Sequence, residues 1–126
     1  MKEYVERRKY RRFEVPGALV KIGKAQKYPL FRPFSNPFPL LNACVGGVNI
    51  LCSKALNTGE NQLLELQAPG EKAVRLRSKV VWTNPVPLST DILIGFELYP
   101  FGEGKDLNPP EAMGILRRLY ERYITP

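Results

Sequence analysis

Closely spaced turn residues restrict most of this chain to short extended segments. Twelve prolines and ten glycines fall among its 126 residues. The pairs Pro16-Gly17, Thr58-Gly59, Pro69-Gly70 and Asn84-Pro85 separate apolar stretches that are only a few residues long. Short alternating stretches between such pairs are typical of strands, whereas a helix usually needs ten or more residues. Strands joined by tight turns, with no helix between them, favour an antiparallel barrel or sandwich.

Five segments have the apolar alternation of a strand. They are residues 13–22, 48–52, 63–66, 74–82 and 91–99. In the fourth, Val74, Leu76, Ser78 and Val80 share one face, and Arg75, Arg77, Lys79 and Val81 share the other. Because successive side chains of a strand point to opposite faces, this pattern predicts a half-exposed basic strand that ends at Asn84-Pro85.

Residues 29–40 predict an irregular loop, because each of their four prolines lacks the backbone donor that a central strand needs. Phe31, Phe34 and Phe38 lie among these prolines. The loop either packs its own rings or docks a protein partner. The following segment, residues 42–47, predicts a turn with paired glycines.

The last part of the chain predicts one amphipathic helix. Asn108 is a suitable N-cap, and Pro109 and Pro110 suit the first helical positions. An apolar stripe then recurs at helical spacing, and its members are Met113, Leu116, Tyr120 and Tyr123. Arg117, Arg118 and Arg122 fall largely outside it. The chain is therefore expected to form one domain, with a flexible basic arm (1–12), a barrel (13–107) and a packed helix (108–126).

Positive charge is concentrated at the start of the chain. Nineteen basic and twelve acidic residues give a net charge of +7 and a pI near 9.6. The first twelve residues hold six of the basic residues and only two acidic ones, which accounts for four of the seven charges. This distribution indicates an anionic partner that binds the arm.

The chain contains no histidine, which excludes histidine-based catalysis and the commonest metal ligand. Its two cysteines, Cys44 and Cys52, are eight residues apart and match no zinc-site spacing. Without a plausible acid–base pair, a binding protein is favoured over an enzyme. No apolar targeting segment follows Met1 and no apolar run is long enough to span a membrane, so a cytoplasmic protein with reduced thiols is expected.

Two separated motifs resemble those of the PilZ domain, a bacterial receptor for cyclic di-GMP. The family's Arg-x-x-x-Arg element is matched by Arg8-Lys9-Tyr10-Arg11-Arg12. Its Asp/Asn-x-Ser-x-x-Gly element is matched by Asn42-Ala43-Cys44-Val45-Gly46-Gly47 in every specified position except the serine. Arg7 and Arg11 are also four apart, but Arg12 directly precedes the first predicted strand, as the family's second arginine does. Later segments also resemble the family's strands, namely Gly59, residues 64–66, 80–82 and 95–97.

The resemblance implies a six-stranded antiparallel PilZ-like barrel that binds cyclic di-GMP. Arg8 and Arg12 would bind guanine edges and phosphate, with Arg7 as an auxiliary clamp. Arginine suits this ligand because its planar guanidinium matches guanine O6 and N7, carries charge for phosphate and stacks on bases. Asn42 would address a guanine edge or orient an arginine, or simply form a turn.

Three further positions have two interpretations each. Gly47 would let the ligand approach the backbone, or would serve turn geometry alone. Trp82 would stack at the rim of the site, or belong to a partly buried core. Cys44 replaces the family's serine with a poorer hydrogen-bond donor, which predicts a loss of about 0.5–1.5 kcal/mol in binding, or it is a small residue that is simply buried or half-buried.

Three functions are therefore compared. The favoured one is a cyclic di-GMP effector or adaptor that acts through an unidentified protein partner, with loop 29–40 as a contact surface. The second is a degenerate adaptor that has lost nucleotide binding through Cys44. The third, less favoured, is a single-stranded nucleic-acid binder that would use Arg75, Arg77, Lys79 and the basic arm as a phosphate track, with Trp82 for stacking.

Overall fold

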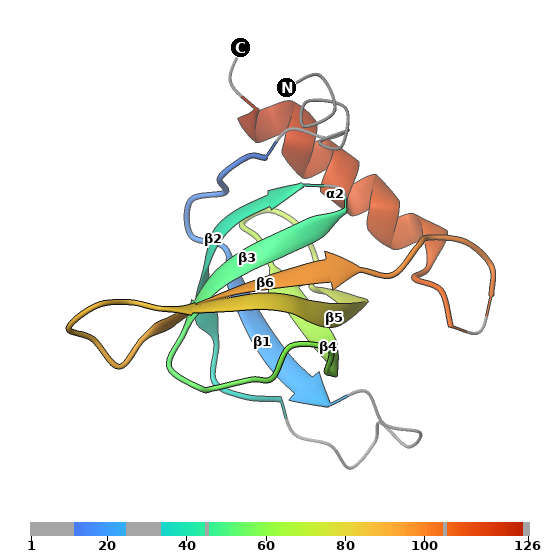
Figure 1. Cartoon of the computed structure of the whole chain (residues 1–126). Coiled ribbons are helices and arrows are strands. Elements are labelled where there is room, and N and C mark those ends of the chain that lie inside the picture. The colour runs from blue at the N-terminus through green and yellow to red at the C-terminus, as the bar shows by residue number, and fades with distance from the viewer. Residues whose placement is uncertain (1–11, 25–33, 45, 105, 125–126) are drawn as a thin grey trace, which may run out of the picture.

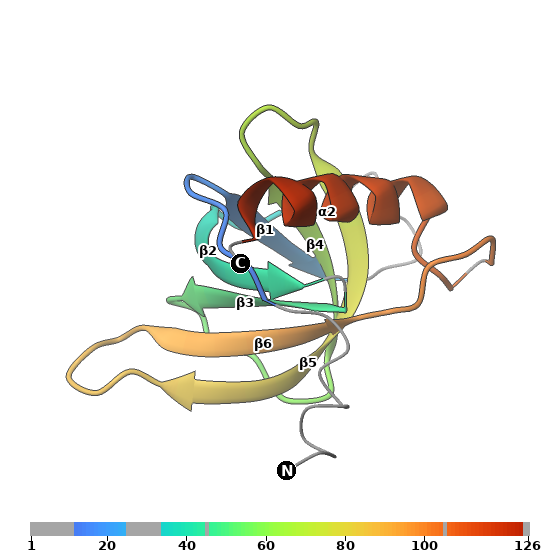
Figure 2. The same ribbon diagram turned by 90° about the horizontal axis from the view of Figure 1, so that it is seen from above.

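The described residues form one closed antiparallel barrel with a helix packed on it. The computed structural model describes residues 12–24, 34–44, 46–104 and 106–124. Their elements are β1 (Leu19–Lys24), β2 (Phe38–Cys44), β3 (Gly47–Cys52), β4 (Asn61–Gln67), β5 (Val74–Pro85), β6 (Ile92–Leu98) and α2 (Pro110–Tyr123). The strands close in the order β1-β2-β3-β6-β5-β4, and α2 lies across the barrel (Figure 1, Figure 2). This confirms the predicted six-stranded antiparallel barrel with one C-terminal helix.

Alternation along the strands builds the core. In β5, Val74, Leu76, Ser78 and Val80 are buried, and the four residues between and after them are exposed, as the sequence predicts. The other strands contribute their inward residues in the same way, and α2 adds Ala112, Ile115, Leu116 and Leu119. Burying each large apolar side chain contributes about 1.5–3 kcal/mol, which holds α2 on the barrel.

Two expectations about the helix are wrong. Its buried stripe is shifted, so that Met113 is only half-buried. The residue at the N-cap position is Pro109, and Asn108 is fully buried before it. Asn108 Oδ1 accepts from the Arg77 backbone N–H at 2.6 Å, and Nδ2 donates to the Arg77 and Tyr99 carbonyls at 3.1 and 2.9 Å. The backbone groups of Arg77 in β5 and of Tyr99, just after β6, need hydrogen-bond partners. The Asn108 side chain binds them and therefore does not cap α2.

The start of the barrel differs from the sequence prediction. The first strand begins at Leu19 instead of residue 13, because Pro16 and Gly17 form a turn in which Gly17 has a φ of 82°. Phe13 makes an isolated bridge to Ala43. The segment before β1 therefore crosses to β2 and does not extend β1.

Strand β2 lies where the sequence predicts no strand. Phe38 to Leu40 belong to it, although the sequence predicts a loop there, and residues 42–44 belong to it, although a turn was expected. Pro39 is tolerated because β1 and β2 pair at just two positions, Leu19 with Pro39 and Val20 with Phe38. Similarly, β5 continues to Pro85, which pairs with Ile92 as the last residue before the hairpin loop.

The described end of the predicted 29–40 loop is packed against the barrel. Phe34 and Phe38 are half-buried, and the Arg75 guanidinium lies 5.0 Å from the centroid of the Phe34 ring. Phe31 lies outside the described residues. These two rings therefore fit the interpretation in which the segment packs its own aromatic residues.

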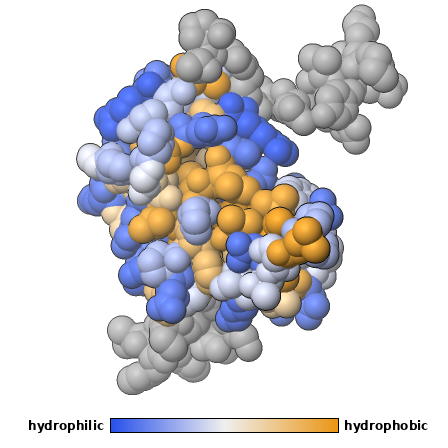
Figure 3. Space-filling model, turned by 90° about the vertical axis from the view of Figure 1, so that its left-hand side faces the viewer, coloured by the Kyte–Doolittle hydropathy of each residue, from blue (hydrophilic) through white to orange (hydrophobic). Residues whose placement is uncertain are grey.

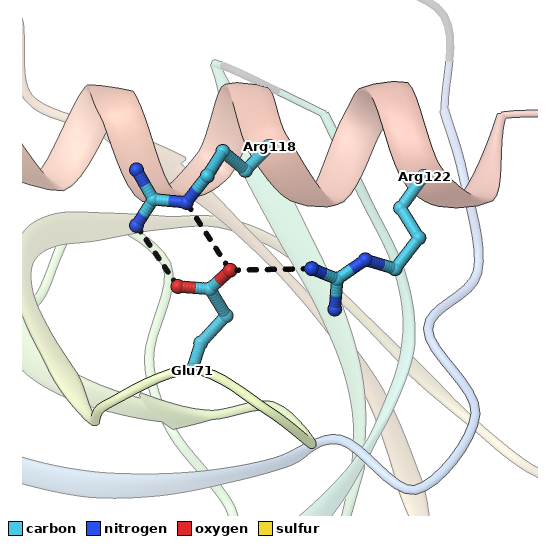
Figure 4. A network of polar contacts seen from close by, with 3 residues as sticks. All are labelled: Glu71, Arg118 and Arg122. Atoms are coloured by element: carbon cyan, nitrogen blue, oxygen red, sulfur yellow. Dashed lines mark hydrogen bonds and ion pairs between the residues drawn. The ribbon is translucent and has the colours of Figure 1, made fainter.

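An ionic cluster connects α2 to the β4–β5 turn. Arg118 Nε and Nη2 donate to the two carboxylate oxygens of Glu71 at 3.2 and 2.9 Å, and Arg122 Nη2 lies 3.7 Å from Glu71 Oε2 (Figure 4). The Glu71 side chain is 9% exposed, whereas the two arginines are about half exposed. The bidentate bond to Arg118 lowers the pKa of Glu71 below its ordinary value.

Glu71 should therefore make stability depend on pH. Because its pKa is lower in the folded chain than in the unfolded chain, its contribution is complete above the ordinary value of 4.5 and is lost as the pH falls through the folded value. We expect Glu71→Gln to lower the free energy of unfolding at pH 7, and this difference to shrink in acid. Urea unfolding from pH 7 to pH 3 measures it. Glu121→Gln, an exposed change on α2, is the control, and a pH-independent difference would contradict the prediction.

Candidate functional site

Packing of Phe13 places Arg12 beside the second motif. The Phe13 and Ala43 backbones exchange two hydrogen bonds of 2.8 Å, and the Phe13 ring packs edge-on against Tyr120 of α2 with centroids 5.7 Å apart. Because Phe13 is buried in an extended segment, Arg12 and Glu14 on either side of it project outward. Arg12 thus lines the same cavities as Asn42, although thirty positions separate them in the sequence.

Asn49 on β3 binds the Arg12 guanidinium and contacts Asn42 on β2. The Asn42 and Asn49 side chains lie 2.8 Å apart, and Arg12 Nη1 lies 2.9 Å from the Asn49 amide. A guanidinium can only donate, so the oxygen of Asn49 faces it, and Nδ2 of Asn49 donates to the Val48 carbonyl at 3.2 Å. The opposite orientation, with Asn49 Nδ2 donating to Asn42, would turn N–H groups toward Arg12. When the oxygen of Asn49 faces Arg12, the Asn42 amide must be turned over as well, so that its nitrogen and not its oxygen faces the same oxygen of Asn49.

Cavities open on both sides of this cluster. The smaller measures 160 Å³, and its lining residues are Arg12, Asn42, Cys44, Gly46, Gly47, Val48, Asn49, Val81, Trp82, Phe96 and Glu97. The larger measures 510 Å³ and is lined by Arg12, Phe13, Glu14, Pro16, Asn42 and Tyr123. Arg12 and Asn42 line both cavities, so they stand between two adjacent hollows in the surface.

The structure brings together most of the site residues that the sequence predicts. Arg12, Asn42, Cys44, Gly47 and Trp82 all line the smaller cavity. Arg7 and Arg8 lie outside the described residues. Their roles remain predictions from the sequence.

Gly47 is explained by the barrel itself. It begins β3 and pairs with Glu97, and a Cβ there would lie 2.7 Å from the Phe96 carbonyl oxygen. Its φ is not in the left-handed region, in contrast to Gly17, Gly59 and Gly70. Glycine is therefore required here by the close approach of β6, and not by turn geometry.

Trp82 lies on the outside of the barrel and is 38% exposed. It pairs with Gly95 across a β-bulge that begins after Val80. A Cβ on Gly95 would lie 2.3 Å from the indole, so the ring covers this glycine closely. Such a ring offers an accessible face beside the smaller cavity, which matches the stacking interpretation and not a place in the core.

Sequence analysis missed Asn49, Glu14 and Tyr123. Asn49 is 9% exposed, and its signal is one amide inside the apolar run from Val48 to Leu51. Glu14 and Tyr123 line the larger cavity together, although 109 positions separate them. Nothing in the sequence relates these two residues, because the packing of α2 on Phe13 brings them together.

The remaining polar chemistry is modest. Burial raises the pKa of the Cys52 thiol, which exchanges hydrogen bonds with the Lys54 backbone at 3.2 and 3.3 Å. Within the described ranges, no cluster of three or more acidic or cysteine side chains is arranged to hold a metal ion. None of the helices among the described residues is long and apolar enough to cross a membrane.

Comparison with known proteins identifies the architecture. No family model matches the chain, and no curated protein sequence matches it either. Solved structures do match it. Among them are the Bacillus subtilis inhibitor of motility MotI/DgrA, with a TM-score of 0.64 and 17% identity over 91% of this chain, and Escherichia coli YcgR in complex with c-di-GMP, with a TM-score of 0.65 and 15% identity over 92% of this chain. This chain spans 50% of the first protein and 45% of the second.

Proposed function

Since the chain has a PilZ-like fold, we propose that it binds cyclic di-GMP beside Arg12 and acts as a signalling effector through a protein partner. The observation that carries this proposal is the meeting of Arg12, Asn42 and Asn49 between two cavities on the barrel surface. A similar fold occurs in YcgR, which was solved with this ligand. Arg7 and Arg8, five and four positions before Arg12, would supply further guanidinium groups.

The chemistry of the cluster fits a guanine dinucleotide. Guanine O6 and N7 accept two parallel hydrogen bonds from one guanidinium, and the phosphodiesters add charge-assisted bonds. Asn49 fixes the orientation of the Arg12 guanidinium before the ligand arrives, which lowers the entropic cost of binding. Trp82 provides a flat apolar face for a base at the smaller cavity. No acid–base pair is required, since the proposed activity is binding without chemistry.

Calorimetric titration of the full chain with cyclic di-GMP tests the proposal. We expect saturable binding, with cyclic di-AMP as the control ligand and a clear preference for the guanine compound. The absence of binding to cyclic di-GMP at ligand concentrations well above those of the protein would contradict it. The titration also gives the number of ligands per chain.

A protein partner is supported by apolar surface outside the candidate site. Five large apolar residues are exposed in the described chain; Val81 and Trp82 line the smaller cavity, whereas Leu19, Leu41 and Leu88 line neither cavity. Figure 3 shows an apolar area on the face toward which the β5–β6 hairpin projects. Leu88 lies in this hairpin with a φ of 60° and is fully exposed, an unfavourable position for leucine in water. Effectors without an output activity of their own need such a contact surface.

The second candidate is an adaptor that has lost nucleotide binding, and the position of Cys44 favours it. Cys44 lines the smaller cavity where the resemblance places a serine hydroxyl. We expect Cys44→Ser to raise affinity for cyclic di-GMP by up to about tenfold, because a hydroxyl is the better donor. Calorimetry on both proteins separates the candidates. A wild-type chain that does not bind and a serine variant that does would identify the adaptor. Cys44→Ala, which has no hydrogen-bond donor on its side chain, is the control.

Ion pairs between basic side chains and glutamates weaken the nucleic-acid alternative. Arg75 Nε pairs with Glu65 at 3.3 Å, and Glu71 neutralises charge on Arg118 and Arg122. A phosphate track along β5 would therefore rest mainly on Arg77 and Lys79. A small dinucleotide needs fewer cations than a long strand, so it fits this surface better.

A further inference from the structure

The larger cavity is lined by groups of opposite hydrogen-bonding character. Arg12 and Glu14 both project outward from the segment that Phe13 anchors, and both line this cavity. Tyr123, near the end of α2, forms another part of its lining. The cavity thus combines a donor, an acceptor and an aromatic ring.

We propose that the larger cavity is a guanine-specific pocket in which Arg12 and Glu14 bind two adjacent edges of one base and Tyr123 contacts its face. This inference rests on the proposed function and names the residue that selects guanine. The O6 and N7 atoms of guanine are acceptors and match Arg12, whereas its N1–H and N2–H₂ groups are donors and match the Glu14 carboxylate. Adenine has an acceptor at N1 and no amino group at C2, so it would face the carboxylate without a donor.

The sizes of the cavities support this division. Ligand pockets for molecules of this size usually measure about 300–1,000 Å³, and the larger cavity, at 510 Å³, falls in that range. The smaller cavity, at 160 Å³, lies below it and has room for a single ring system beside Trp82. A dinucleotide would therefore place one base in each cavity. Its phosphates would lie beside Arg12 and away from Glu14, since a carboxylate repels phosphate.

Tyr123 is held in place by its own contacts on α2. The Arg122 guanidinium lies 5.9 Å from the centroid of the Tyr123 ring, and Glu71 fixes Arg122 in turn. One helical turn earlier, Tyr120 packs on Phe13. A base that contacts Tyr123 would therefore connect the ligand to the C-terminal end of α2. Figure 2 shows that this end of the helix lies beside the start of the described chain.

Titrations of variants with two ligands test this inference. Glu14 is exposed, so Glu14→Gln should fold as the wild type does. We expect this variant to bind cyclic di-GMP about 10- to 100-fold more weakly, the usual effect of losing a charge-assisted pair of hydrogen bonds, with no loss of affinity for cyclic di-AMP. Tyr123→Ala should lower the affinities for both ligands by a similar factor. Tyr123→Phe keeps the aromatic ring and should leave both affinities unchanged. Glu121→Gln is the control for a lost charge.

The outcomes separate this inference from the proposed function. If the wild-type chain binds cyclic di-GMP and Glu14→Gln leaves the ratio of the two affinities unchanged, the guanine pocket is wrong and the proposed function survives. If the wild-type chain binds neither dinucleotide, the proposed function fails and the pocket fails with it. A ratio that falls at least tenfold in Glu14→Gln alone supports the assignment of Glu14.

Discussion

Replacing Arg12 by alanine should reduce the affinity for cyclic di-GMP by about 100-fold or more. Arg12 lines both cavities, and its guanidinium is already oriented by Asn49 at 2.9 Å. Each hydrogen bond to a charged group contributes about 1.5–3 kcal/mol, so two such bonds account for an effect of this size. Calorimetric titration of the variant against the wild-type chain measures it.

The control for this variant is Arg117→Ala. Arg117 is exposed on α2 and belongs to neither cavity, so its loss removes the same net charge without touching the cluster. If both variants lose affinity equally, a diffuse attraction between the basic chain and the anionic ligand explains binding, and the Arg12 cluster is wrong. Arg12→Lys distinguishes further, because lysine keeps the charge but cannot form two parallel bonds to guanine. We expect it to recover less than half of the lost binding free energy.

The barrel was predictable because its strands bury one face. Alternation of apolar and polar residues from Val74 to Val81 determines which side of β5 points inward, and the structure follows this pattern residue by residue. The boundaries were less predictable where pairing is irregular. Pro39 and Pro85 lie in strands, and each occupies a position where the ladder is short or ends. A rule based on residue preferences excludes proline from every strand. In the structure, proline is excluded only from positions where a neighbouring strand needs its backbone N–H.

The candidate site was predictable where a motif is local and not where packing assembles it. Asn42, Cys44 and Gly47 fall within six positions of each other, so a sequence pattern suffices to find them. Asn49 and Glu14 become relevant only when the Phe13–Ala43 bridge brings the first segment against β2. Asn108 is another case in which packing decides the role of a residue. Asparagine is a common N-cap residue, but the side chain of Asn108 bonds to the backbone of β5 instead.

Gly47→Ala should destabilise the barrel, although Gly47 lies in the motif that resembles a ligand-binding element. A Cβ at this position would be 2.7 Å from the backbone oxygen of Phe96. This oxygen can move little, because the pairing of β3 with β6 holds the backbone of Phe96 in place. Overpacking of this kind costs about 1–3 kcal/mol. We expect the free energy of unfolding to fall by that amount in urea titrations, with or without ligand present in the assay.

Gly46→Ala is a matched control in the adjacent position. A Cβ there meets no atom within 4 Å, and its backbone is not in the left-handed region, so we expect the free energy of unfolding to stay within about 0.5 kcal/mol of the wild-type value. If Gly47→Ala weakened ligand binding while leaving stability unchanged, this glycine would serve the ligand directly. If it lowers stability and Gly46→Ala does not, the pairing of β3 with β6 requires the motif glycine even in the absence of a nucleotide. Any loss of affinity in Gly47→Ala then follows from the distorted strand, because Cys44 and Asn49 line the smaller cavity from the two strands that meet at this position.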